Sequence, residues 1–165
     1  MRMTHTWTWF CLVAILVAVA LPLSSHSRAD EGKPEEESAE AAIEFTDVRA
    51  QTQEFMEYYA TIELTREQEA VKRAALSPLP AACCSNNSAY TCCCECNLSR
   101  TVWGLTAYLI TERDAGVEEI QKAVTEWIQF VNPDGFSGDS CFKGGCMRSF
   151  AKNGCGGMNA GHLIW

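Results

Sequence analysis

Cysteine is the residue type that most clearly carries chemistry in this chain of 165 residues. Ten cysteines are present, and six of them lie between residues 83 and 96. Thiolates are the preferred ligands of soft ions such as Cu(I) and Zn²⁺. We therefore expect a protein that binds or delivers copper or zinc without catalytic turnover. The candidate metal ligands are Cys83, Cys84, Cys92, Cys93, Cys94, Cys96, Cys141, Cys146 and Cys155.

The spacing within the first group suits a soft metal, because Cys93-x-x-Cys96 and Cys94-x-Cys96 each place two sulfurs on one loop. Zn²⁺ takes four ligands, whereas Cu(I) accepts two or three sulfurs and also methionine. An iron–sulfur cluster uses similar thiolates, but an oxidising compartment disfavours it. Three residues beside the later cysteines favour copper over zinc: Met147, Met158 and His162.

Two other interpretations of the cysteines stay open. In the first, Cys93 and Cys96 form a thiol–disulfide exchange pair just before a helix, whose N-terminus lowers a thiol pKa while Glu95 opposes that effect. In the second, disulfides staple a structural or interaction module, as is usual in exported proteins. An odd number of cysteines after the apolar N-terminal run, and the divergence of adjacent side chains, count against disulfides alone.

The elements that must position these cysteines are helical. Apolar residues recur at spacings of three, four and seven across residues 43–131, which predicts a mainly α fold, a small bundle of three to four helices. Thr65 and Gln68 fit a capping box, and Pro78 should end the helix that it opens near Ser77. No run alternates with a period of two, so we expect no sheet. Two further apolar stripes are Leu98, Val102, Leu105 and Leu109, and Val117, Ile120, Val124, Trp127 and Val131.

The N-terminal segment has the layout of a secretory signal. Arg2 precedes an apolar run of about 14 residues that ends before Ser27-Arg28-Ala29, and such a run is shorter than the roughly 20 residues of a membrane span. We expect cleavage after Ala29 and export to the periplasm or outside, with a retained N-terminal anchor as the alternative. Residues 30–42 are acidic and lack aromatic residues, which predicts a solvated leader.

Residues 132–165 form a tail rich in glycine and cysteine. Ordering such a segment is entropically costly, because glycine loses much conformational freedom on folding. The tail can pack on the helical domain of residues 43–131 only if something holds it there. We therefore expect at least one of Cys141, Cys146 and Cys155 to lie within ligand or disulfide distance of the 83–96 group.

Two resemblances support an exported thiol protein. Cys93-x-x-Cys96 followed by Asn97-Leu98-Ser99, the segment 116–120, and a last helix ending in Phe130-Val131-x-Pro133 resemble the small periplasmic thiol proteins of cytochrome c maturation. That resemblance implies a three-helix unit with Cys93 and Cys96 as its reactive pair. The run 92–96 also resembles bacterial exported proteins with a Pro-Cys-Tyr-Cys-Gly-Cys signature, a family without a settled function.

Charge and composition exclude several functions. The net charge of −8 makes the chain a poor partner for nucleic acids, which require a basic surface. His162 is the one histidine beyond the N-terminal segment 1–29, so a Ser-His-Asp site is not expected. The expected partners are a metal ion or an exported protein. After signal cleavage we expect no stable membrane span.

Overall fold

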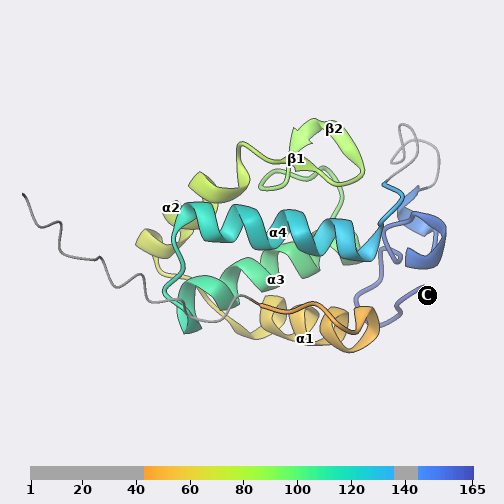
Figure 1. The fold of residues 1–165 in the computed structure, drawn as a ribbon, viewed down its shortest axis with the longest axis horizontal. Coiled ribbons are helices and arrows are strands. Elements are labelled where there is room, and N and C mark those ends of the chain that lie inside the picture. Colours follow the sequence, from red (N-terminus) through yellow and green to blue (C-terminus); the bar gives the residue numbers. More distant parts are fainter. Residues whose placement is uncertain (1–42, 136–144) are drawn as a thin grey trace, which may run out of the picture. The chain divides into compact units, whose positions relative to one another are not determined.

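The computed structural model describes residues 43–135 and 145–165 (Figure 1). The expected signal segment 1–29, the acidic leader 30–42 and Cys141 lie outside these residues. The described part contains four α-helices: α1 (Val48–Thr61), α2 (Arg66–Leu76), α3 (Asn97–Glu112) and α4 (Val117–Val131). The expectation of a mainly α domain is therefore confirmed. No helix in this described part is long and apolar enough to cross a membrane.

The helix ends follow the capping signals in the sequence. Thr65 Oγ1 accepts a hydrogen bond from the backbone N–H of Gln68 at 3.2 Å, and the Gln68 side chain accepts one from the N–H of Thr65 at 2.9 Å. This arrangement confirms the predicted capping box. Helix α2 ends at Leu76, two residues before Pro78, as expected. At the start of α4, Glu119 accepts a hydrogen bond from the backbone N–H of Gly116 at 2.9 Å.

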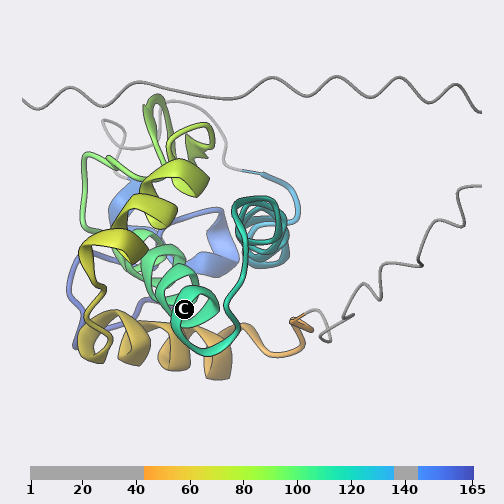
Figure 2. The ribbon, with the colours of Figure 1, turned by 90° about the vertical axis from the view of Figure 1, so that its left-hand side faces the viewer.

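Helix α3 lies between the other three helices (Figure 2). Its apolar stripe is buried, and so are four of the five residues of the α4 stripe, Ile120, Val124, Trp127 and Val131. Trp127 is fully buried, and its indole N–H donates a hydrogen bond to Thr101 Oγ1 at 2.9 Å. The two stripes thus form the centre of the hydrophobic core, which fixes the N-terminus of α3 in space.

Gly104 allows α1 and α3 to approach very closely. A Cβ atom added at this position would lie 1.8 Å from the backbone oxygen of Phe55 and 2.8 Å from the backbone nitrogen of Tyr59. Both neighbours are backbone atoms within α1, so they cannot rotate away. A side chain at Gly104 would therefore force the two helices apart.

The expectation of no sheet is wrong. Strands β1 (Pro80–Ala81) and β2 (Cys84–Ser88) pair antiparallel, with Ala81 opposite Cys84 and Pro80 opposite Ser88. The register shifts between Pro80 and Ala81. Strand β2 reads Cys-Ser-Asn-Asn-Ser and carries no apolar alternation, because backbone pairing rather than a buried face forms this hairpin. Its turn holds Cys83.

Candidate metal centre

Five of the eight described cysteines form one group of sulfurs, which we call the inner cysteine cluster. Its members are Cys83, Cys92, Cys96, Cys146 and Cys155. Four of the five are buried, and Cys92 is half-buried. Cys155 and Cys96 are the least accessible, with 0% and 1% of their surface exposed. These sulfurs are therefore shielded from bulk water.

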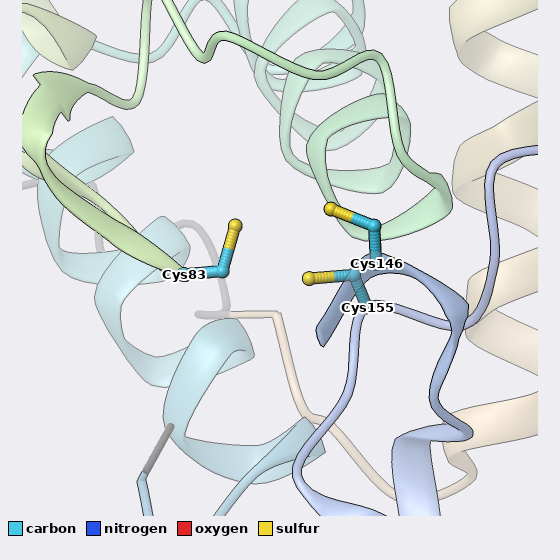
Figure 3. A group of neighbouring side chains, drawn as sticks. All are labelled: Cys83, Cys146 and Cys155. Carbon is cyan, nitrogen blue, oxygen red and sulfur yellow. The ribbon is translucent and has the colours of Figure 1, made fainter. Parts of the chain in front are cut away.

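The cluster joins cysteines that are distant in the sequence. The Sγ atoms of Cys83, Cys146 and Cys155 all lie within 4.8 Å of one another, and Figure 3 shows the sulfurs directed into the space between the hairpin and the tail. The Cys96 sulfur forms hydrogen bonds with Cys155, Cys83 and Cys92. The expectation that a tail cysteine approaches the 83–96 group is thus confirmed for two tail cysteines.

Three separate segments bring these sulfurs together. Cys83 lies in the turn of the β1–β2 hairpin, and Cys92 follows β2 in a loop. Cys96 is the N-cap of α3, with an extended backbone and no hydrogen bond from its side chain to the backbone of the helix start. Cys146 lies in the short 3₁₀-helix η1 (Gly145–Met147), and Cys155 follows the 3₁₀-helix η2 (Phe150–Lys152). The hairpin, the helix start and the tail each contribute to one site.

Two glycines bend the tail around the start of α3. Gly156 and Gly157 have φ of +71° and +97°, values that side chains disfavour. At this bend, two backbone oxygens of the tail accept hydrogen bonds from the start of α3. Asn97 N–H donates to Gly157 O at 2.9 Å, and Leu98 N–H donates to Cys155 O at 3.1 Å. Two N–H groups that a helix start normally leaves unpaired are therefore satisfied by the segment that carries Cys155.

Asn97 strengthens the same junction through its side chain. Its amide nitrogen donates hydrogen bonds to the oxygens of Gly156 at 2.8 Å and Asn159 at 3.1 Å. Its amide oxygen accepts a hydrogen bond from Arg100 at 3.1 Å. Asn97 is fully buried, so these bonds replace the hydration that it loses on folding.

The far end of the tail is also anchored by side chains. Trp165 lies 5.7 Å from the ring of Phe150, measured between centroids, and the guanidinium of Arg49 in α1 lies 4.8 Å from the Trp165 ring. Burial of such aromatic surface is favourable. The tail is therefore attached to the helices at both its cysteine-bearing bend and its last residue.

The inner cysteine cluster favours one negative charge at Cys96. The pKa of the Cys96 thiol is held well below its ordinary value by hydrogen bonds from Cys155, Cys83 and Cys92. The pKa of Cys83 is raised by its hydrogen bonds with Cys155, Cys92 and Cys96 and by burial. The helix N-terminus at Cys96 also favours a thiolate. A bound cation would allow the remaining thiols to lose their protons as well.

Ser99 is a site residue that sequence reasoning did not identify. Its hydroxyl oxygen lies 3.0 Å from Cys92 Sγ and 3.2 Å from Cys96 Sγ. A hydroxyl at this position orients two sulfurs of the cluster. The available signal was its place three residues after Cys96, at the first turn of the expected helix.

A cavity of about 10 Å³ adjoins the cluster. Its lining includes the sulfur-bearing residues Cys83, Cys92 and Cys96 together with apolar residues such as Leu98 and Val102. This space holds about one water-sized particle and no larger organic ligand.

No family model, curated protein or solved structure matches this chain.

Three described cysteines form a second set, which we call the outer cysteine group: Cys84, Cys93 and Cys94. Cys93 is exposed, and Cys84 and Cys94 are half-buried. Cys93 Sγ lies 3.6 Å from Cys94 Sγ, and Cys84 forms a hydrogen bond with Cys93. The structure thus places Cys93 in the outer group and Cys96 in the inner cluster.

The sulfur and nitrogen donors considered as copper ligands lie at the surface. Met147 and Met158 are 63% and 38% exposed, and His162 is exposed. The buried donors described in the structure are therefore thiols, a set that suits zinc as well as copper.

We expect Asn87→Ala to slow the alkylation of Cys84. Asn87 Nδ2 donates a hydrogen bond to Cys84 Sγ at 3.3 Å, and this bond is the main cause of a lowered Cys84 pKa, followed by the backbone N–H of Asn86. Removing the donor raises the pKa, so half-maximal labelling by iodoacetamide should move to higher pH. Peptide mass spectrometry across a pH series measures this shift. Asn86→Ala is the control, because its backbone N–H remains, and an equal shift in both variants would contradict the assignment.

Proposed function

We propose that this protein is an exported metal-binding protein whose inner cysteine cluster holds one soft ion, Zn²⁺ or Cu(I), without catalytic turnover. The observation that carries the proposal is the convergence of buried sulfurs from the hairpin, the start of α3 and the tail. Export is inferred from the signal-like pattern of residues 1–29. No described residue outside the cysteines is needed to bind the ion.

Distances support a mononuclear site. Four sulfurs bound to one Zn²⁺ at about 2.3 Å lie about 3.8 Å from each other in a tetrahedron. The sulfurs of Cys83, Cys146 and Cys155 already lie within 4.8 Å of one another before any ion is considered. Small side-chain rotations therefore suffice to close the site around an ion.

The surroundings of the cluster also favour a cation. Burying thiolates in an apolar environment is costly unless their charge is compensated. Two of the described residues that line the adjoining cavity, Leu98 and Val102, are apolar and supply no charge. A metal ion provides the compensation and binds the sulfurs at the same time.

The alternative interpretations receive less support from the geometry. Thiol–disulfide exchange between Cys93 and Cys96 requires their sulfurs to meet, and these residues belong to different sulfur groups. A stapled module requires cysteines in separate pairs, whereas no disulfide joins the eight described cysteines and five of them share one cluster. Metal binding is the function that uses the cluster as a unit.

The double substitution Cys83→Ser/Cys155→Ser tests the proposal. Reduced protein is loaded with Zn²⁺, or with one equivalent of Cu(I), and the retained ion is counted by native mass spectrometry and by chelator competition. We expect affinity to fall by at least about 100-fold, because two thiolate ligands are lost. Cys93→Ser is the matched control and should retain its ion.

Helical circular dichroism identifies variants that fail to fold. The single substitution Ser99→Ala gives a second, milder measurement in a chain that keeps every sulfur. We expect it to weaken affinity by about 10-fold, since it removes a hydroxyl that orients Cys92 and Cys96. Reduced wild-type protein that retains neither ion would refute the proposed function.

A further inference from the structure

The adjacent cysteines of this chain divide between two sulfur layers. Cys83 belongs to the inner cysteine cluster and Cys84 to the outer cysteine group, and Cys92 and Cys93 divide in the same way. Cys83 lies in the hairpin turn and Cys92 in the loop before α3, and at both places the next residue along the chain carries its sulfur into the outer group. The doublets therefore place an exposed set of sulfurs next to the buried one.

The outer group is itself an assembled set rather than scattered surface cysteines. Cys84 comes from β2, whereas Cys93 and Cys94 come from the loop before α3. The Cys84–Cys93 hydrogen bond joins these segments, and Cys94 Sγ lies 3.6 Å from Cys93 Sγ. The Asn87 amide, 3.3 Å from Cys84 Sγ, orients the first of the three sulfurs. Cys93 Sγ therefore lies next to both Cys84 and Cys94, and sulfurs from two segments meet at the surface.

We propose that the outer cysteine group is a second metal site, which takes up Cu(I) from solution and passes it to the inner cysteine cluster. This inference rests on the proposed function in one respect: the inner cysteine cluster must be able to hold the ion that the outer group passes on. Two or three thiolates satisfy Cu(I), whereas Zn²⁺ takes four ligands. The outer group supplies three sulfurs, so it suits Cu(I) better than Zn²⁺.

The exposure of the two sites explains the direction of transfer. Cys93 is exposed, so an incoming carrier or small chelate can reach it, whereas Cys155 and Cys96 are inaccessible. Cys84 and Cys93 are each covalently adjacent to an inner ligand, Cys83 and Cys92. The ion therefore moves by ligand exchange over a short distance, with one sulfur replacing another.

The transfer involves protons and no electrons. Cu(I) binding at the outer group displaces a proton from each thiol that becomes a ligand. When the ion moves inward, the inner thiols release protons and the outer thiolates regain theirs. Copper remains Cu(I) throughout, so no oxidant or reductant takes part in the step.

Cu(I) titration of the reduced full chain under anaerobic conditions tests this site. Cu(I) is supplied as its bicinchoninate complex, and stopped-flow absorbance follows its uptake. We expect wild type to bind two ions, and Cys84→Ser/Cys93→Ser to bind one ion with uptake at least about 10-fold slower. Asn86→Ser, an exposed change in the same strand, is the matched control and should behave as wild type.

The inner variant Cys83→Ser/Cys155→Ser separates this proposal from the proposed function. We expect it to keep rapid uptake of one ion and to lose the tightly held ion. Unchanged stoichiometry and uptake rate in Cys84→Ser/Cys93→Ser would overturn the outer site and leave the inner one standing. Loss of both ions in that variant, with helical circular dichroism intact, would equally overturn the idea of two separate sites.

Discussion

Gly104→Ala is expected to lower the free energy of unfolding by about 3 kcal/mol, the upper part of the range for overpacking a rigid site. The added Cβ would meet the backbone oxygen of Phe55 at 1.8 Å, and backbone within a helix cannot move aside alone. The whole α1–α3 contact must widen, which also loosens the packing of Phe55 against Trp127. Urea denaturation followed by circular dichroism measures the change.

Gly116→Ala is the control for this prediction. A Cβ at Gly116 would meet only Glu119 Oε2, at 3.8 Å, and the backbone there is in an ordinary extended conformation. Its effect should stay within about 1 kcal/mol, the usual size of a change at a helix N-cap. Equal destabilisation by the two substitutions would show that close packing at Gly104 is not what sets the stability.

Removing the metal from reduced protein is expected to release the tail from the start of α3. The tail holds few apolar residues, and its bend is attached through Cys155 and the hydrogen bonds to Asn97 and Leu98. Chelation takes away the proposed ion and leaves the buried thiolates uncompensated, so the segment loses one of the attachments that hold it. Amide exchange at Asn97 and Leu98 should accelerate on the order of 100-fold.

Hydrogen–deuterium exchange with and without a chelator makes this measurement. The amide of Ile120 serves as the internal control, because it donates to Gly116 O at 3.1 Å at the start of α4, a helix that carries no cysteine. It should remain protected. Unchanged exchange at Asn97 and Leu98 after complete metal removal would show that hydrogen bonds and Trp165 alone hold the tail.

The helices were predictable from the sequence because their signals are local. The capping box at Thr65 and the apolar stripe from Leu98 to Leu109 each depend on residues within one helix. The approach of the tail to the cysteine-rich loop was also predictable, since little else could order a glycine-rich segment. Gly104 was different, because a glycine within a helix gives no indication of which backbone lies against it.

The division of the cysteines into two layers was not predictable from spacing. Cys83 and Cys84 are chemically identical neighbours, and the pairing of Ala81 with Cys84 in the hairpin fixes the strand geometry around them. That pairing involves backbone groups and a polar strand. The sequence therefore has no hydrophobic alternation that would predict the strand. The role of Asn97 was not predictable either, because an asparagine at a helix start resembles an ordinary capping residue. Its hydrogen-bond partners lie about 60 positions away in the sequence.

The seating of the tail on the start of α3 has a consequence for the growing chain. Cys83 and Cys96 leave the ribosome long before Cys146 and Cys155, the residues that complete the inner cysteine cluster. Until then the cluster lacks two of its five sulfurs, and the first N–H groups of α3 lack their tail acceptors. Contacts between such distant positions form late in folding. A nascent chain therefore lacks the finished site, and capture of the proposed ion would coincide with the last step of folding.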